Sequence, residues 1–592
     1  MADDTAQPQS KIPCLLDLCT DILVLIVELL ETSDARSLSL VNSSLHKLAK
    51  YSCHRHLKLD LSEHGFEDTR KHFEIMDGDE LLPAVHSLEI YGPGYGYPTG
   101  DFCTTLVEHN ERYKNRVPRE DRVAFLCRHL PSMTGLRHIQ WHGRDLPDAA
   151  LETLRQFPSV TLCVCVKPPR GPLESKESDL LHRLQDNPNL YRLEVLYTYK
   201  SAKDCLAVTQ PLKDVLLSCP NIRKLRLDLG MPTGGCIIYA PTTKYCGLGF
   251  RNGQRPAALE ELDIVRYPFG VRMESSSSLG HCYHEGYEEE GMEEDYWAEF
   301  FDWSRLRKLK SPSAKFALTL MPKLTALKEI AFYSGWDKDN AVQFYFGVPA
   351  ALEAISVESI KSVTVLGVLR HGPSLRSLRI HQSENRCLEW HKDAIDNNCL
   401  RRIQNGCPNI EELALDLNRY KSWPYTSLDV LASFPRLHTL TIWFELGIHD
   451  RNKPIEPYVT FSAVGMLFKY LHARNSKVKT LIVHSGSPPG PSFGLPSPEA
   501  FWPRYNSSVF ECKLSDRDDQ AAQGMFKTTC YGLSKQGNEW LQARQNPFET
   551  VADGEREIAK FYEDSWDISL NLEPMRVALM GHTPLNRWKA HY

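Results

Sequence analysis

The sequence of 592 residues lacks the features that mark several common classes of protein. Its 69 basic and 75 acidic residues nearly cancel, leaving a net charge of −6, so there is no excess of positive charge for general binding to nucleic acid. No positively charged segment followed by an apolar run opens the chain, and no signal peptide is expected. The apolar stretch over residues 12–30 includes Asp17, Asp21 and Glu28, which are too costly inside lipid for a membrane span. We expect a soluble protein of the cytoplasm, the nucleus or both.

Residues suited to catalysis or metal binding are also sparse. The 17 cysteines are dilute and lie mostly in apolar runs, as reduced, buried thiols do. Residues 163–165 (Cys-Val-Cys) alternate within an expected strand, which favours packing, and residues 281–284 (His-Cys-Tyr-His) have no second cluster at a zinc spacing. Neither a His-Glu-x-x-His helix nor a Gly-Lys-Ser/Thr loop occurs. We therefore expect no catalytic residue, no metal and no cofactor, although scattered histidines could assemble a site that the sequence does not reveal.

The stretch over residues 18–49 indicates three short helices. Its first half places apolar residues at helical spacing, with Asp21 and Glu28 off the apolar stripe. A break follows at residues 31–34, where Ser33 or Asp34 can cap a second helix, and a third helix is expected after residues 42–44. A unit of this size lacks a core large enough to hide all its apolar side chains. Another surface must therefore cover them.

This stretch resembles an F-box, whose pattern is Leu-Pro-x-Glu-Ile-Leu, an apolar helix, and then Asp-Leu-x-x-Leu-x-Leu-Val. Residues 18–23 (Leu-Cys-Thr-Asp-Ile-Leu) and 34–41 (Asp-Ala-Arg-Ser-Leu-Ser-Leu-Val) match it, with Cys19 where the family usually has proline. The resemblance implies docking onto the Skp adaptor of a cullin-RING ubiquitin ligase and, through the adaptor, onto a cullin. The adaptor-binding residues that it implies are Leu18, Ile22, Leu25, Ile26, Leu29, Leu38, Leu40, Val41 and Leu45.

From about residue 130 onward one unit recurs, Leu-x-x-Leu-x-Leu, with other aliphatic or aromatic residues allowed at the leucine positions. The clearest pair is 219–229 and 407–417, which both begin Cys-Pro-Asn-Ile; other copies start at Leu136, Leu190, Leu259, Leu306, Leu327, Leu352, Leu375, Leu437 and Val478. Several intervals fall in the twenties, so the pattern resembles leucine-rich repeats, particularly the cysteine-containing kind found behind F-boxes. No single unit buries its own apolar side, so neighbouring units are expected to stack into a solenoid. The alternative is an ordinary α/β domain with parallel strands.

The repeats are irregular. Only the copy at Ile410 completes the pattern with asparagine, at Asn418, so we expect the usual ladder of asparagine side chains to be mostly missing. The acidic, serine-rich residues 274–297 are expected to form a mobile loop. The predicted fold is α/β: a disordered tail (1–11), a three-helix F-box (12–53), an irregular leucine-rich-repeat solenoid (54–486, with the acidic loop at about 270–297), and a proline-rich linker with a C-terminal cap region (487–592).

Residues between the core leucines should face outward and form a binding surface. Their mixture of charges suits a protein ligand, and Arg226, Arg379 and Trp443 are the residue types that dominate interface energies. Our main hypothesis is a non-enzymatic receptor: the F-box binds the Skp adaptor and the repeats bind an unknown protein substrate, with no nucleic-acid or membrane partner. The alternative is a leucine-rich-repeat scaffold that acts without a ligase and uses its N-terminal helices to cap the solenoid. An enzyme on an α/β domain has no supporting motif.

Overall fold

The computed structural model divides the chain into two compact units. The first unit comprises residues 1–96, 110–194 and 218–221, and the second comprises 97–109, 195–217 and 222–592. The structure describes residues 15, 18–30, 32–62, 65–92, 117–142, 146–167, 180–198, 202–230, 247–250, 253–267, 272–273, 291–332, 337–382, 394–445, 457, 459–486, 508–514 and 525–531.

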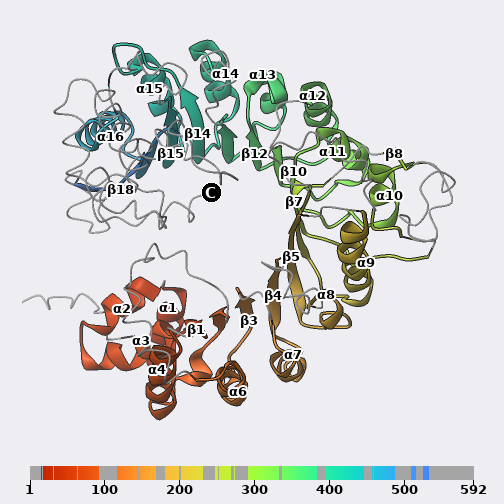
Figure 1. Ribbon diagram of the computed structural model, residues 1–592. Coiled ribbons are helices and arrows are strands. Elements are labelled where there is room, and N and C mark those ends of the chain that lie inside the picture. Colours follow the sequence, from red (N-terminus) through yellow and green to blue (C-terminus); the bar gives the residue numbers. More distant parts are fainter. Residues whose placement is uncertain are drawn as a thin grey trace, which may run out of the picture. The chain divides into compact units, whose positions relative to one another are not determined.

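The fold is mixed α/β, built on a long and mostly parallel sheet of 16 strands whose order follows the chain (Figure 1). A separate two-stranded sheet pairs β8 (Arg272–Met273) with β9 (Gly291–Met292). A long parallel sheet in chain order is the arrangement that stacked repeats produce. The strands of the large sheet are β1 (His56–Asp60), β2 (Ser87–Tyr91), β3 (His138–Trp141), β4 (Thr161–Val166), β5 (Leu190–Thr198), β6 (Lys224–Gly230), β7 (Glu261–Arg266), β10 (Lys308–Ser311), β11 (Glu329–Phe332), β12 (Ala354–Val357), β13 (Ser377–Ile380), β14 (Glu412–Leu417), β15 (Thr439–Phe444), β16 (Thr480–Ser485), β17 (Ser508–Leu514) and β18 (Phe526–Tyr531).

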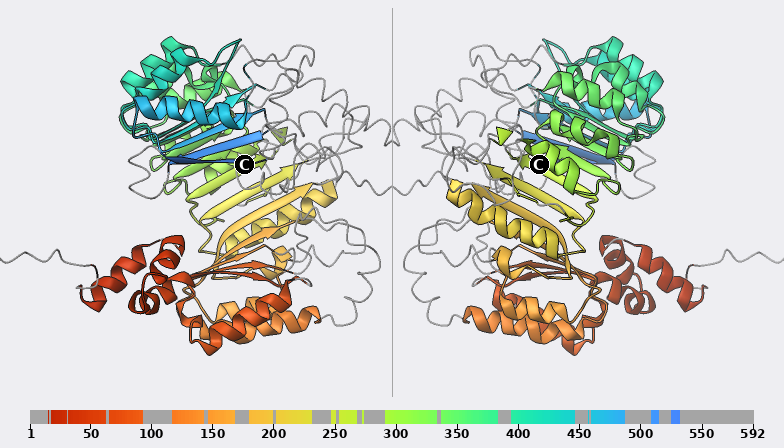
Figure 2. Two further views of the ribbon diagram at one scale, coloured as in Figure 1. Left: turned by 90° about the vertical axis from the view of Figure 1, so that its left-hand side faces the viewer. Right: turned by 90° about the vertical axis from the view of Figure 1, so that its right-hand side faces the viewer.

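In the first unit, three N-terminal helices precede strands β1 to β4, which pair in parallel. Connecting helices follow the strands and cover one face of them (Figures 1 and 2). Arg122, although buried, donates a hydrogen bond of 2.9 Å to the Leu61 carbonyl at the end of β1. The helices of this unit are α1 (Thr20–Leu29), α2 (Thr32–Ser39), α3 (Ser43–Cys53), α4 (Phe66–Gly78), α6 (Arg119–His129), α7 (Asp148–Arg155) and α8 (Leu180–Arg183), with 3₁₀ turns η2 (Leu82–Ala84) and η4 (Leu130–Ser132).

In the second unit, strands β6 to β16 also pair in parallel, and helices again cover one face of the strands (Figure 2). Strands β17 and β18 then add in antiparallel direction beyond β16. No helix among the described residues is both long and apolar enough to span a bilayer. The helices of this unit are α9 (Ala202–Ser218), α10 (Glu293–Phe300), α11 (Ala314–Leu320), α12 (Lys338–Gly347), α13 (Ile360–Arg370), α14 (Asn397–Gly406), α15 (Tyr425–Ala432) and α16 (Phe461–Arg474), with the 3₁₀ turn η7 (Met321–Lys323).

The repeated leucines explain why the strands form where they do. Apart from β5, every strand predicted from a repeat start begins two residues after that start, as β13 does after Leu375. The second leucine of each unit then points between sheet and helices. Across four neighbouring strands Leu378, Leu413, Leu440 and Leu481 meet at one register position, and all are buried. Burying each such side chain contributes about 1.5–3 kcal/mol.

A side-chain ladder does exist, at the opposite end of the strands from the one expected. The residue just before several repeat starts hydrogen-bonds to a backbone carbonyl of the preceding repeat, which satisfies turn groups that would otherwise lack a partner. This ladder is not the usual one after the strand, and the prediction that the usual asparagine ladder is mostly missing stays a prediction. The bonds run from Asn189 Nδ2 to the carbonyls of Phe157 (2.7 Å) and Val160 (2.9 Å), from Asn221 Nδ2 to Pro188 (2.8 Å), from Asn409 Nδ2 to Pro373 (2.8 Å), and from Ser374 Oγ to Leu352 (2.7 Å).

The two Cys-Pro-Asn segments place their thiols in the repeat core. Cys219 and Cys407 are both fully buried, and Cys219 donates a hydrogen bond of 3.1 Å to the Leu184 carbonyl. Burial raises the pKa of the Cys407 thiol to about 11. Both cysteines are therefore neutral, packed side chains at physiological pH.

The predicted acidic loop ends earlier than expected. Residues 293–300 form α10, and Trp297 within that helix is buried against Trp303, Phe301 and Phe316. The boundary was wrong because aromatic packing outweighs the local acidic composition, even for Glu294, which is itself buried. Residues 274–290 lie outside the described residues, as do the tail (1–11) and most of the predicted linker and cap region.

Candidate protein-binding surfaces

The three N-terminal helices pack around a small core. Leu23 and Val27, one turn apart on α1, are buried together with Ala35 of α2 and with Leu45 and Ala49 of α3. The amide of Leu45 donates a 2.8 Å hydrogen bond to the side chain of Asn42, which caps α3. Leu45 was predicted to contact an adaptor, but its side chain lies inside this core. It cannot reach a partner.

The helix starts also differ in detail from the prediction. Helix α2 begins at Thr32, so Ser33 and Asp34 lie within its first turn instead of capping it. An aspartate there is still favourable, because the N-terminal end of a helix attracts negative charge. Cys19 occupies the N-cap of α1 and its side chain makes no capping hydrogen bond.

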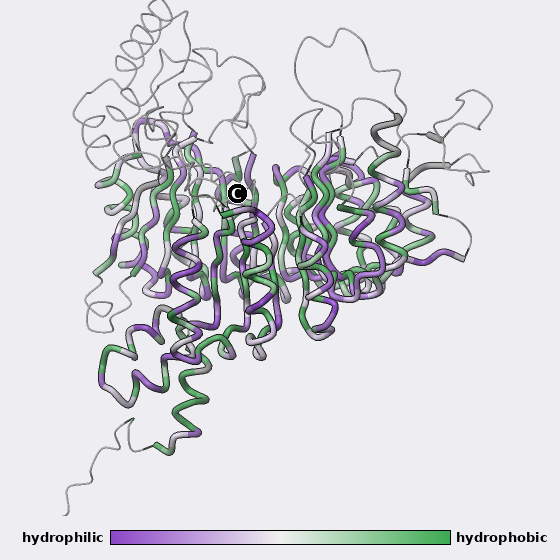
Figure 3. The backbone as a smooth tube through the Cα atoms, turned by 60° about the horizontal axis from the view of Figure 1, so that its bottom comes forward, coloured by the Kyte–Doolittle hydropathy of each residue, from purple (hydrophilic) through white to green (hydrophobic). Residues whose placement is uncertain are grey.

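Most of the predicted adaptor-binding side chains remain exposed. Leu29 is 87% exposed, Leu40 86% and Val41 67%. Leu18, Ile22 and Leu25 are also exposed, while Ile26 and Leu38 are half-buried. Figure 3 shows α1 as an almost continuously hydrophobic helix. Because α1 is apolar on nearly all sides, its packing buries one face and leaves the others in water.

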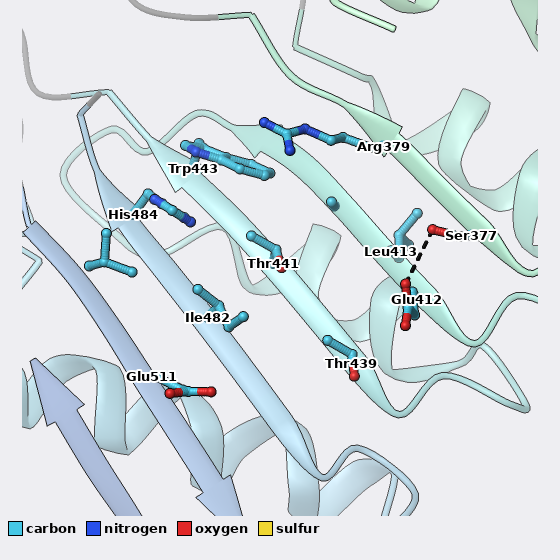
Figure 4. Close-up of a pocket in the computed structure, with 12 residues that line it drawn as sticks. Ser377, Arg379, Glu412, Leu413, Thr439, Thr441, Trp443, Ile482, His484 and Glu511 are labelled. Atoms are coloured by element: carbon cyan, nitrogen blue, oxygen red, sulfur yellow. Dashed lines mark hydrogen bonds between the residues drawn. The ribbon is translucent and has the colours of Figure 1, made fainter. Parts of the chain in front are cut away.

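A second surface lies in the second unit, on the strand face opposite the helices. A cavity of about 240 Å³ opens there across β13 to β17; we call it the strand-face groove (Figure 4). Its lining residues are Ser377, Arg379, Glu412, Leu413, Ala414, Thr439, Thr441, Trp443, Ile482, His484, Val509 and Glu511.

Strand register organises the groove into rows of side chains that cross the strands. What we call the middle row runs Arg379, Ala414, Thr441, Ile482 and Glu511. What we call the tryptophan row runs Asp416, Trp443, His484 and Val509. The hollow exists because Ala414 and Thr441 are small, while the tryptophan row beside them holds large rings. Side chains of both rows point away from the leucine core because neighbours along a strand alternate between its faces.

Aromatic stacking holds Trp443 in place. Its ring stacks on His381 with centroids 4.0 Å apart and on His484 at 4.7 Å, both nearly parallel. The guanidinium of Arg379 lies 4.9 Å from the indole ring, a cation–π contact (Figure 4). Trp443 is only 4% exposed. The groove thus has a fixed aromatic wall with a positive charge at its edge.

A buried hydrogen bond between a histidine and an aspartate supports this wall. His381 and Asp416 lie 2.6 Å apart, from Nδ1 to Oδ1, and the second Asp416 oxygen accepts the Gln382 backbone N–H at 2.7 Å. Burial raises the pKa of the Asp416 carboxyl, against the opposing effects of the His381 ring and Arg379. The bond fixes the orientation of the His381 ring, and therefore of the tryptophan that stacks on it.

Arg226 and the other two predicted substrate contacts do not form one site. Arg379 and Trp443 touch in the groove, whereas Arg226 lies on β6 and its Nε is 3.7 Å from the Asp263 carboxylate on β7. Along β6 to β11 such pairs repeat between adjacent strands, including Lys224–Glu261 at 2.6 Å and Lys308–Glu329 at 2.5 Å. That stretch of the strand face neutralises its own charge, which leaves little for a ligand to pair with.

The groove also contains residues that the sequence did not single out. Glu511 comes from β17, in the region predicted only as a cap, and its side chain is 13% exposed and 2.9 Å from Lys513. His484 was missed because nothing in its own repeat marks it; the signal lies in its register with Trp443. Both residues can be identified as part of the groove only when the register between separate strands is known.

The other candidates add no site among the residues that the structure describes. Within the described ranges, no group of three His, Cys, Asp or Glu side chains comes together to hold a metal. The cluster at 281–284 lies outside those ranges, and Cys163, on β4, is buried with its thiol 3.8 Å from His138. Residues 490–494 (Gly-Pro-Ser-Phe-Gly) have the spacing of a nucleophile elbow, but they too lie outside the described residues.

Comparison with known proteins supports no argument about the fold or function of this chain. No protein-family model matches the chain, and no curated protein sequence matches it. Among solved structures, one that matches is titled "Crystal structure of TLR13-ssRNA13 complex"; it is 10% identical over 53% of this chain and has a TM-score of 0.23. The match spans about half of that protein, 47% of its length. At this level of similarity, the fold and function of the chain must be argued from its own residues.

Proposed function

We propose that this chain is a non-enzymatic receptor of a cullin-RING ubiquitin ligase. Its N-terminal helices α1 to α3 dock onto a Skp adaptor, and its repeats bind a protein substrate. Catalysis in such a complex is proximity, because a held substrate presents its lysines to the ubiquitin-charged enzyme at high effective concentration. The chain itself needs no catalytic residue for this role.

The exposed apolar side chains of the N-terminal helices carry this proposal. A soluble domain rarely leaves leucines such as Leu29 and Leu40 almost entirely in water unless another surface covers them. Together with the F-box-like order of residues 18–23 and 34–41, this supports an adaptor as the covering partner. The buried Leu23 and Val27 hold the helices together, so the exposed side chains are presented by a folded unit.

Co-purification tests the proposal directly. The full-length chain, tagged at its C-terminus, is expressed in cells and its partners are identified by mass spectrometry. We expect a Skp adaptor and a cullin among them, and direct binding between the purified chain and the purified adaptor. Absence of both would favour the alternative, a repeat scaffold that acts without a ligase.

A further inference from the structure

The strand-face groove has opposite charges at its two ends. Arg379 on β13 and Glu511 on β17 belong to the same middle row, four strands apart. At about 4.8 Å per strand the two positions are roughly 19 Å apart, too far to pair with each other. Between them lie Ala414, Thr441 and Ile482, which are uncharged and half-buried.

The floor of the groove suits a peptide backbone. The hydroxyls of Ser377, Thr439 and Thr441 line it, and each can both donate and accept a hydrogen bond.

The size and charge of the groove narrow the class of ligand. Its volume of about 240 Å³ is below the roughly 300–1,000 Å³ typical of small-molecule pockets. It holds one or two side chains of a longer molecule that continues across the strands. Nucleic acid is disfavoured, because the carboxylates of Glu412 and Glu511 would repel its phosphates.

We propose that the strand-face groove binds an extended segment of a partner protein with an acidic side chain at Arg379 and a basic side chain at Glu511. An extended chain rises about 3.3 Å per residue, so the two charges are roughly six residues apart. This inference rests on the proposed function only in assuming that the repeats bind a protein. It adds where the segment lies and what it must contain.

The contacts around Arg379 define where the acidic group binds. A guanidinium stacked on an aromatic face directs its N–H groups outward in its own plane, where a carboxylate can accept two of them. Trp443 supplies that face at 4.9 Å. Glu412 lies on the next strand, on the side of the guanidinium away from Trp443 (Figure 4), and the buried Asp416 lies on the same strand beside Trp443. An acidic group that binds Arg379 must therefore approach between these two carboxylates, over Ala414. At the other end of the groove, the carboxylate of Glu511 pairs with Lys513 and also binds the basic side chain of the partner segment.

Peptide selection tests this even while the natural substrate is unidentified. A phage library of random peptides, about 12 residues long to span the groove with margin, is selected on the purified full-length chain. It is selected in parallel on Arg379→Glu, on Glu511→Lys and on the control Arg376→Glu. Arg376 is exposed just before the same strand and pairs with Glu411 at 3.1 Å, outside the groove. We expect enriched peptides to carry an acidic and a basic residue about six apart. Peptides selected on Arg379→Glu should no longer be enriched in the acidic residue, and those selected on Glu511→Lys should no longer be enriched in the basic residue. Peptides selected on Arg376→Glu should keep both.

Binding measurements with synthetic copies of the enriched peptides give the change in affinity that each charge reversal causes. Each charge reversal in the groove should weaken binding about five- to tenfold, because an attraction is replaced by a repulsion. Reversing the matching charge on the peptide should weaken its binding to the unchanged chain equally, a result that does not depend on how well a variant folds. No enrichment, or identical peptides from the unchanged chain and Arg379→Glu, would overturn the inference. Because no adaptor is present, this outcome is independent of whether α1 to α3 bind one.

Discussion

Replacing Leu29 and Leu40 together by aspartate is expected to abolish adaptor binding while the chain stays folded. The two side chains are 87% and 86% exposed, so their replacement removes almost no packing from the isolated protein. Fully burying one leucine at an interface contributes about 1.5–3 kcal/mol. Losing two such contributions weakens binding by roughly a hundredfold or more, and burying the new carboxylates adds a further penalty.

Calorimetric titration with purified Skp adaptor measures the affinity of each variant. Thermal unfolding of the same variants shows whether the chain stays folded. The matched control is Ile75→Asp on α4, a side chain of the same unit that is 62% exposed and has no predicted role. Leu45→Asp gives the opposite contrast, because Leu45 is 3% exposed and its replacement should unfold the three helices. The reasoning fails if the Leu29/Leu40 double variant binds the adaptor within about threefold of the unchanged chain, the scatter of ordinary surface substitutions. It also fails if the control loses binding equally.

Three further predictions concern stability. Asn189→Ala, which removes two hydrogen bonds to turn carbonyls, should lower the free energy of unfolding by about 1–3 kcal/mol, measured with urea. Trp297→Ala should cost about 3–5 kcal/mol by the same measurement, and an effect below ~1 kcal/mol would show that α10 is not docked. The buried His371 ring accepts the Leu352 N–H through Nδ1 and bonds to the Tyr345 carbonyl through Nε2, and burial lowers its pKa below 6.5. As the pH falls, His371 is protonated in the unfolded chain before it is protonated in the folded chain. The free energy of unfolding should therefore decrease below pH 6.5, by up to about 1.4 kcal/mol per pH unit. His371→Gln should show a smaller decrease when urea unfolding is measured at a series of pH values.

The sequence predicted the parts of the fold that depend on local pattern. Leucine spacing located the strands because one apolar side chain in two must face the core, whatever the loops do. It located α1 to α3 as well, but it did not identify which face of α1 is buried. With Leu23, Leu25, Ile26 and Val27 all apolar, several faces are equally hydrophobic. Packing against the other two helices, mainly α3, places Leu23 and Val27 in the interior.

The groove depends on register between strands separated by long connections, which the sequence does not encode locally. Trp443 and Arg379 were singled out by residue type, and the structure places them together. The stack of His381 on Trp443 crosses the intervening strand β14, so no motif within one repeat could reveal it. Arg226 has the same residue type as Arg379 and differs in its neighbour, Asp263.

The alternating charges on β6, β7, β10 and β11 limit how this array can change in length during evolution. Lys224, Glu261, Lys308 and Glu329 follow one another at a single register position. Deleting the repeat that contains β7 would bring Lys224 beside Lys308, and like charges directly opposite each other are destabilising. Deleting two adjacent repeats would instead bring Lys224 beside Glu329 and preserve the alternation. We expect this part of the chain to gain or lose repeats in pairs.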